Sequence, residues 1–165
     1  MDGELLNQLY LRYYREIYLY LCALCRNEAQ AEDLTQETFL KALLSLSESH
    51  GNFRAWLHLV ARNLFFNERK RTGRELSTDT VEAVETGESP LDRLLTDERT
   101  RLLYEALSRL EERKREVLEL QYFSGLSQRE IAAVLRLNPE HVRVLAYRGR
   151  REIRNWMEEN GYDVP

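Results

Sequence analysis

The amino-acid sequence predicts an all-α protein in which two small helical domains are joined by a flexible linker. Its 165 residues include only 7 glycines and 3 prolines, and they are rich in Leu, Glu, Arg and Ala, which favour helices. Along most of the chain, apolar residues recur at steps of three and four, the period of an amphipathic helix. One stretch in the middle lacks this period, and it separates two parts whose size suits small domains.

Residues 1–73 are expected to form a three-helix domain. The apolar period predicts helices over about residues 4–25, 28–46 and 53–71, and Asn52 is placed to cap the third. Three helices of this length can bury one another's apolar stripes. The predicted inner stripe of the third helix consists of Phe53, Trp56, Leu57, Val60 and Leu64.

Residues 74–97 are expected to be a flexible acidic linker. This stretch contains Gly87, Pro90 and several Ser and Thr residues, a composition that buries too little apolar surface to fold by itself. Residues 76–100 carry 7 acidic and 2 basic side chains, so the net charge of −4 is concentrated here. The negative net charge therefore does not exclude nucleic-acid binding by the domains on either side.

Residues 98–165 are expected to form a second domain, of four helices, that ends in a helix-turn-helix. Ser127 and Glu130 have the spacing of a capping box, which predicts the start of a short helix. After a three-residue turn, Asn138 can cap the last helix and Pro139 can occupy its first position. A short helix, a tight turn and a longer basic helix are typical of a DNA-binding motif.

The last helix carries a predicted DNA-reading face opposite its apolar side. Arg can form two hydrogen bonds with guanine in the major groove, and an exposed Val can contact a thymine methyl group. The alternative is an ordinary solvated basic face. The residues of this predicted face are Glu140, Arg143, Val144, Tyr147, Arg148 and Arg151.

The third helix has a second basic face, which is predicted to lie opposite its apolar stripe. Residues 54–74 hold six Arg or Lys side chains and one Glu. An exposed aromatic ring among cations suits unstacked bases and phosphates. Alternatively, Phe65 packs against another helix and the Arg side chains are merely solvated. The residues of this face are Arg54, His58, Arg62, Phe65 and Arg69.

The second helix presents a third candidate surface, an acidic one. Asp33, Gln36, Glu37 and Leu40 project together, away from the inner stripe of this helix. Such a face is unsuited to DNA and suits a basic protein partner. Taken alone, the pattern favours a solvated acidic face over a binding surface.

No catalytic, cofactor or metal site is predicted. The sequence has no glycine-rich phosphate loop and no nucleophile paired with a His. Cys22 and Cys25 form a C-x-x-C motif without a second pair of ligands nearby, so two small apolar side chains on a helix are expected. No apolar run is long enough to span a bilayer, and the N-terminus lacks the layout of a secretory signal, so a cytoplasmic protein is expected.

Three blocks of the sequence resemble those of the extracytoplasmic-function (ECF) sigma factors, a group of the sigma-70 family of bacterial transcription initiation factors. The first is A-E-D-L-T-Q-E-T-F-L at residues 31–40, and the second is F-R-A-W-L at 53–57 with A-R-N at 61–63. The third is L-S-Q-R-E-I-A at 126–132, followed by residues 142–148. The order and spacing of the blocks, and the acidic linker between them, also agree with the family.

The resemblance implies a role for each domain. The first domain would be sigma region 2, which holds the beta-prime clamp helices of core RNA polymerase through the acidic face and opens promoter DNA at the minus-ten element. A loop over about residues 45–52 would capture a flipped base, which adds His50 and Asn52 to the minus-ten residues. The second domain would be sigma region 4, which reads the minus-35 element through Arg143, Val144, Tyr147 and Arg148.

The partners implied by the resemblance are core RNA polymerase (its beta and beta-prime subunits), promoter DNA and an anti-sigma factor, often membrane-bound, while the chain itself is not expected to enter a membrane. The sequence departs from the family pattern in three places: the minus-ten loop is short, Gly149 stands where Ala is usual, and Ala146 replaces a larger apolar residue. The last domain is then either less stable or more closely packed. The alternatives are a stand-alone helix-turn-helix regulator and, disfavoured by the two basic stretches, a helical adaptor that never touches DNA.

Overall fold

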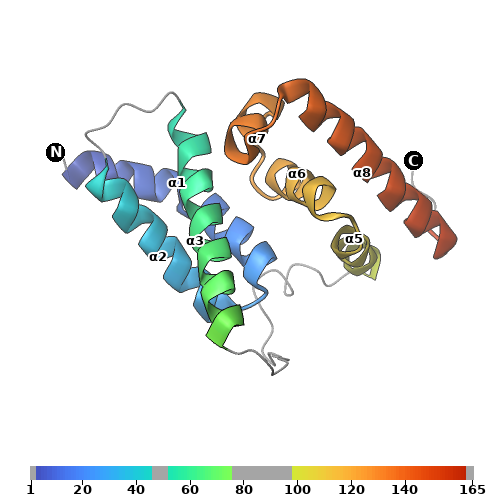
Figure 1. Cartoon of the computed structure of the whole chain (residues 1–165), viewed down its shortest axis with the longest axis horizontal. Coiled ribbons are helices and arrows are strands. Elements are labelled where there is room, and N and C mark those ends of the chain that lie inside the picture. The colour runs from blue at the N-terminus through green and yellow to red at the C-terminus, as the bar shows by residue number, and fades with distance from the viewer. Residues whose placement is uncertain (1–2, 46–51, 76–97, 163–165) are drawn as a thin grey trace. The chain divides into compact units, whose positions relative to one another are not determined.

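The part of the protein that the structure describes is built of α-helices. The computed structural model describes residues 3–45, 52–75 and 98–162, and within them it contains seven helices and no strand. The chain divides into two compact units, residues 1–91 and 92–165 (Figure 1). The all-α fold with two helical domains is therefore as predicted. None of the described helices is long and apolar enough to cross a lipid bilayer.

The first domain is a three-helix bundle (Figure 1). Its helices α1 (Gly3–Cys25), α2 (Glu28–Leu44) and α3 (Phe53–Glu75) each pack against the other two. The Asn27 side chain caps α2 by accepting a hydrogen bond of 2.9 Å from the Gln30 N–H. Asn52 caps α3 as predicted, because its Oδ1 accepts a hydrogen bond of 3.0 Å from the Ala55 N–H.

Helix α3 is longer than the sequence predicts. It was expected to end near residue 71, and it continues to Glu75, so the first two residues of the predicted linker, 74–97, belong to this helix. The rest of that linker, residues 76–97, lies outside the described residues, as does Leu46 at the predicted end of the second helix.

A polar cluster links α1 to α3 inside the first domain. The Arg54 guanidinium donates two hydrogen bonds to the Glu16 carboxylate, from Nε at 2.7 Å and from Nη2 at 3.2 Å. His58 is completely buried beside this pair: its Nδ1 lies 2.9 Å from the Arg54 carbonyl oxygen, and its Nε2 lies 3.7 Å from Glu16 Oε2. Buried polar groups are tolerated where they have such partners, so the cluster fixes how α1 and α3 are aligned.

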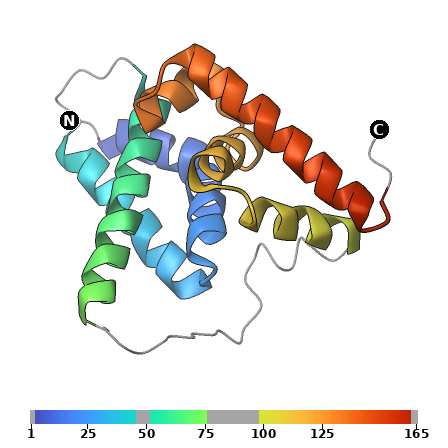
Figure 2. The ribbon, with the colours of Figure 1, turned by 45° about the vertical axis from the view of Figure 1, so that its right-hand side comes forward.

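The second domain places a long helix against three shorter ones. The shorter helices α5 (Glu98–Ser108), α6 (Glu112–Tyr122) and α7 (Gln128–Leu135) each pack against α8 (Pro139–Glu159) (Figure 2). Gly125 ends the α6 segment with a φ of 67°, a left-handed conformation that glycine adopts without strain. The centre of the domain is apolar, and its most deeply buried residues are Val117, Leu118, Leu120, Ile131, Val134 and Val142.

Gly149 is buried where α8 crosses α6. A Cβ atom added to Gly149 would lie 2.9 Å from Leu118 Cδ1 and 3.6 Å from Lys114 Cβ. Of the two outcomes expected for a glycine at this position, the structure therefore supports the closer packing of the last helix. Ala146, the other small residue of α8, is also buried.

Candidate functional site

The helix-turn-helix is held by three local devices. The capping box is present as predicted: Ser127 Oγ accepts a hydrogen bond of 3.1 Å from the Glu130 N–H, and Glu130 Oε1 accepts one of 2.9 Å from the Ser127 N–H. Arg136 adopts a left-handed conformation with a φ of 58°, which ends α7. Asn138 Oδ1 then accepts a hydrogen bond of 2.8 Å from the Glu140 N–H, and Pro139 begins α8.

These caps and the turn between them fix which face of α8 is exposed to solvent. Of the residues predicted for its inner side, Val142, Ala146 and Gly149 are buried in the domain, whereas Ile153 and Trp156 are half-buried. The predicted reading face is exposed as expected, except that Val144 is half-buried. The exposed members are Glu140, Arg143, Tyr147, Arg148 and Arg151. Tyr147 keeps 55% of its surface accessible, so a large ring stands among cations on this face.

Arg143 and Glu140 form an ion pair on the reading face. Arg143 donates from both Nε, at 3.1 Å, and Nη2 to the same carboxylate oxygen, Oε2 of Glu140. The hydrogen bond and the charge of Arg143 lower the pKa of Glu140, so the carboxylate stays ionised. The pair orients the guanidinium at the start of the helix, where it can address a base edge in a major groove.

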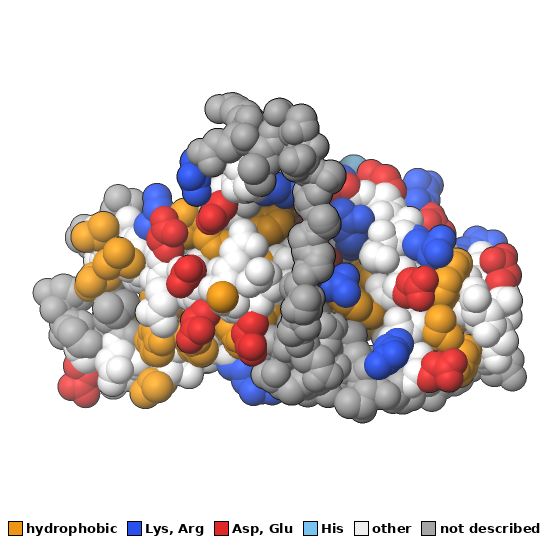
Figure 3. All heavy atoms as spheres, turned by 90° about the horizontal axis from the view of Figure 1, so that it is seen from below, with side chains coloured by type: hydrophobic (Ala, Val, Ile, Leu, Met, Phe, Trp, Pro, Cys, Tyr) orange, Lys and Arg blue, Asp and Glu red, His pale blue; other side chains and the backbone are white. Residues whose placement is uncertain are grey.

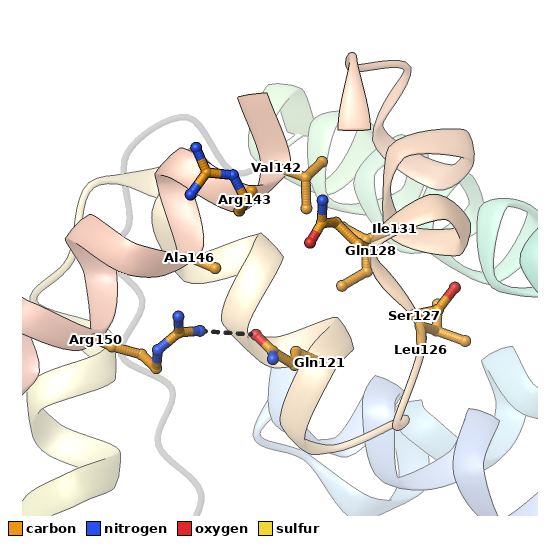
Figure 4. A pocket seen from close by; sticks show the side chains of 9 residues that line it. All are labelled: Gln121, Leu126, Ser127, Gln128, Ile131, Val142, Arg143, Ala146 and Arg150. Atoms are coloured by element: carbon orange, nitrogen blue, oxygen red, sulfur yellow. Dashed lines mark hydrogen bonds between the residues drawn. The ribbon is translucent and has the colours of Figure 1, made fainter. Parts of the chain in front are cut away.

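A pocket of about 210 Å³ lies beside this face, among α6, α7 and α8 (Figure 4). Arg150 reaches from α8 toward α6, with its Nη1 3.5 Å from Gln121 Oε1. Gln128 donates a hydrogen bond of 3.2 Å to the Pro139 carbonyl oxygen across the turn. The pocket lining, which combines cationic and amide groups with an apolar floor, consists of Gln121, Leu126, Ser127, Gln128, Ile131, Val142, Arg143, Ala146 and Arg150.

The pocket was not predicted from the sequence. Gln121, Gln128 and Arg150 come from three different helices, and a helical period shows only residues that share one helix. The sequence feature that could have pointed to Arg150 as a functional residue is the high Arg content of the last helix. Two guanidinium groups beside amide donors are suited to phosphate oxygens, which is the kind of contact that fixes a reading helix on DNA.

The predicted basic face of the third helix needs correction. His58 and Phe65 were expected to be exposed, but the structure leaves them 0% and 7% accessible. The reason is that α3 packs against both α1 and α2, so its buried surface is wider than one apolar stripe. Arg54 is half-buried and holds Glu16, as described above, which makes it part of the α1–α3 link.

Phe66, which was not predicted to belong to either face of the third helix, is more accessible than the neighbouring Phe65. Its half-buried ring has the Arg62 guanidinium carbon 4.8 Å from the centroid and the Arg69 carbon at 5.9 Å. Phe65 packs edge-to-face against it, with centroids 4.9 Å apart. Arg62 and Arg69, both predicted for this face, thus form a basic–aromatic cluster with Phe66 in place of the predicted Phe65. Asn52 is exposed at the helix start, and His50 lies outside the described residues.

The acidic face of α2 is present on the surface. Asp33, Gln36, Glu37 and Leu40 are all exposed, and Leu40 keeps 56% of its surface accessible. Acidic side chains gather with apolar ones over the first domain on the face that Figure 3 shows. The arrangement of two carboxylates beside an exposed leucine suits a basic protein surface with an apolar contact.

The C-x-x-C motif lies inside the helical bundle. Cys22 is buried and Cys25 half-buried, and both are free thiols. Burial raises the pKa of Cys25 to about 12, so this thiol is not a nucleophile near neutral pH. Within the described ranges, no group of three His, Cys, Asp or Glu side chains is arranged to hold a metal ion.

Comparison with known proteins gives one consistent result. Family models match the chain twice, "Sigma-70 region 2" over residues 9–75 and "Sigma-70, region 4" over residues 100–153. Among curated relatives, the ECF RNA polymerase sigma factor BldN of Streptomyces coelicolor is 32% identical over 92% of this chain, which spans 60% of BldN. The RNA polymerase sigma factor YlaC of Bacillus subtilis is 30% identical over 94% of this chain and 93% of its own length.

A solved structure shares the fold. The sigma factor RpoE of Bartonella quintana, crystallised in complex with the anti-sigma factor NepR, superposes with a TM-score of 0.70 and covers 92% of this chain and 96% of its own. Its sequence identity is 23%.

Proposed function

The chain belongs to the sigma-70 family and is an ECF sigma factor, a transcription initiation factor that is not itself an enzyme, and we propose that its three surfaces divide the work of promoter recognition. In this proposal the acidic face binds core RNA polymerase, the α3 cluster binds the minus-ten element, and the α8 face reads the minus-35 element. The protein acts in the cytoplasm, where polymerase and DNA are found.

The observation that carries the proposal is the exposed face of α8. Its Arg143 and Arg148 are presented on a helix whose start is fixed by Asn138 and Pro139. In a helix-turn-helix, the first turns of the second helix enter the major groove. We therefore assign base contacts to Arg143, Val144, Tyr147 and Arg148. Phosphate contacts are assigned to Arg151 and to the pocket residue Arg150.

The minus-ten assignment is revised from the sequence-based one. We assign the aromatic contact to Phe66 in place of Phe65, because a ring that stacks on an unpaired base must be accessible. Arg62 and Arg69 flank that ring and supply the positive charge that the DNA backbone requires. Asn52, exposed at the end of the loop, remains a candidate for the strand-separating region, as does His50. Arg54 and His58 are assigned to holding α1 against α3.

The polymerase assignment uses the acidic face of Asp33, Gln36, Glu37 and Leu40. This face also distinguishes the proposal from a stand-alone helix-turn-helix regulator, which has no need of it. The beta and beta-prime subunits are the proposed partners, with beta-prime on this face. An anti-sigma factor that covers these surfaces is the proposed means of inhibition, because RpoE of Bartonella quintana, which shares the fold, was solved with one.

A charge-reversal experiment tests the polymerase assignment. The double variant Asp33→Arg and Glu37→Arg is expected to lose binding to core polymerase, because it opposes a basic surface with cations. Binding is measured by fluorescence anisotropy of the labelled full chain, and transcription by run-off assays. The matched control is Glu158→Arg with Glu159→Arg, the same charge change at the exposed end of α8. Wild-type affinity of the Asp33/Glu37 variant, with retained helicity, would refute the assignment.

A further inference from the structure

One wall of the pocket among α6, α7 and α8 is built from α8. Arg143, Ala146 and Arg150 follow one another at steps of three and four, so they lie on one side of this helix. Ala146 contributes only a methyl group to the wall, and Figure 4 shows it between the two longer side chains. The pocket therefore opens between two guanidinium groups, and a larger side chain at position 146 would occupy part of it.

The floor of the pocket is apolar and its far side carries an amide. The floor residues Leu126, Ile131 and Val142 are no more than 3% accessible. On the far side, the Gln121 oxygen accepts the hydrogen bond from Arg150, so the amide nitrogen of Gln121 is the atom that can donate to a ligand (Figure 4). The pocket thus combines hydrogen-bond donors at its rim with a surface that favours a hydrocarbon group.

Arg150 supplies the positive charge of the pocket. Arg143 shares its guanidinium with Glu140, whereas the bond of Arg150 to Gln121 engages one of five donors. Among the described residues that line the pocket, none is acidic. A carboxylate offers two acceptor oxygens in the geometry that a guanidinium matches, so an anionic group of this kind is the favoured partner of Arg150.

The volume of the pocket limits the size of the ligand. The pocket measures about 210 Å³, and a cavity of about 150 Å³ in another protein holds a benzene molecule. A ring or a branched alkyl group with one carboxylate therefore fits, whereas an inorganic anion would leave the floor uncovered. We propose that the pocket binds a small carboxylate whose charged group pairs with Arg150 and whose compact apolar body covers Leu126, Ile131 and Val142.

Such a ligand competes with DNA. This consequence rests on the proposed function, in which Arg150 contacts a phosphate of the minus-35 element. A guanidinium that holds the ligand's carboxylate cannot hold that phosphate in the same way, so the ligand and the DNA exclude each other at this side chain. The ligand is therefore an inhibitor of transcription from promoters that depend on the minus-35 element.

Binding is tested without DNA or polymerase, so that the result does not depend on the proposed function. The probe is phenylacetate, titrated into the full chain and followed by the shifts of its backbone amide signals in NMR. A Kd on the order of 1 mM is expected for a ligand of about ten non-hydrogen atoms. Phenylacetamide, which lacks the charge, and inorganic phosphate, which lacks the apolar body, should each bind at least about fivefold more weakly. Phosphate that binds as tightly as phenylacetate would overturn the proposal, because the pocket would then be only a phosphate contact.

Two variants locate the ligand. Arg150→Gln should weaken phenylacetate binding at least about fivefold by removing the charge, and Ala146→Leu should abolish it by filling the pocket. The matched control is Arg154→Gln, an exposed arginine of the same helix that does not line the pocket, which should bind like wild type. Wild-type affinity in both pocket variants would place the ligand elsewhere and overturn the proposal. Should Ala146→Leu melt early, the result for Arg150→Gln, a change at an exposed side chain, decides.

Transcription separates the competition from the proposed function. Saturating phenylacetate is expected to reduce run-off transcription by the wild-type holoenzyme from a minus-35-dependent promoter, and phenylacetamide is not. If phenylacetate binds without reducing transcription while Arg150→Gln does reduce it, the competition is overturned. If neither phenylacetate nor Arg150→Gln reduces it, the assignment of Arg150 to a DNA phosphate fails, and the competition fails with it.

Discussion

Leu118 occupies the space that a side chain at Gly149 would need. The distance of 2.9 Å between Leu118 Cδ1 and a Cβ built on Gly149 is shorter than carbon atoms tolerate, and Leu118 is completely buried. Gly149→Ala would gain about 1 kcal/mol of helix propensity. Overpacking of a filled core costs about 1–3 kcal/mol, so the net effect is expected to be destabilising.

The change in the free energy of unfolding caused by Gly149→Ala is measured by urea unfolding of the full chain, in the wild-type and in a Leu118→Val background. The smaller Val removes the clashing methyl, so Gly149→Ala should cost less there. Gly73→Ala in α3 is the control, because a Cβ at Gly73 meets nothing within 4 Å and should be neutral or stabilising. Equal effects of Gly149→Ala in both backgrounds would show that the contact with Leu118 is not the cause.

Glu119 makes the second domain sensitive to pH. It is 4% exposed in α6, its Oε1 has no hydrogen-bond partner among the described residues, and burial raises its pKa from 4.5 to about 8, against the opposing charge of Arg115. The folded domain therefore keeps this proton up to about pH 8, whereas the unfolded chain loses it near pH 4.5. The contribution of Glu119 to stability is fully present below pH 4.5 and is lost as the pH rises to 8.

Glu119→Gln is expected to flatten that part of the pH dependence. Stability is followed by the fluorescence of Trp156 during urea unfolding at pH 5, 6, 7 and 8, in a Trp56→Phe background so that only the second domain is reported. Glu159→Gln, an exposed carboxylate of α8, serves as the control. A Glu119→Gln protein that loses stability with rising pH as steeply as wild type would show that another group titrates.

Phe66 is expected to matter for opening DNA, and Phe65 is not. Phe66→Leu keeps apolar volume but removes the ring, and stacking on a base is worth about 1–3 kcal/mol. The population of open promoter complexes, measured by permanganate reactivity of unpaired thymines, should fall at least severalfold. The neighbouring Phe65→Leu is the control, because Phe65 is buried. Equal opening by both variants would contradict the assignment of Phe66.

Arg143 and Arg148 are expected to read the minus-35 element. A base-reading Arg changed to Ala should cost about 1–3 kcal/mol and relax the preference at one base pair, whereas a phosphate contact should weaken all sequences alike. The measurement is run-off transcription by the holoenzyme from promoters that carry each single-base change in this element. If Arg143→Ala and Arg148→Ala both transcribe like wild type, the reading surface lies elsewhere.

How much the sequence could predict depended on whether a feature was local. The caps at Ser127, Asn138 and Asn52 were predicted because each involves residues within three positions of one another. The exposed aromatic residue of α3 was predicted to be Phe65, whereas the more accessible ring is that of Phe66. The helical period of α3 alone does not show that both α1 and α2 pack against this helix. The pocket lined by Gln121, Gln128 and Arg150 required the tertiary fold, as did the Leu118–Gly149 contact.

If Arg143 reads a base as proposed, its ion pair with Glu140 makes the base compete with the Glu140 carboxylate for the guanidinium. In the free protein the guanidinium already has an acceptor, so any base that engages it must displace the Glu140 carboxylate or share the donors with it. A guanine offers two acceptors in the matching geometry and can do this, while a pair that offers one leaves Arg143 with its own helix. The Glu140 carboxylate then competes with the base for the Arg143 guanidinium. This competition weakens binding to every DNA sequence, and it weakens binding to the wrong sequence most.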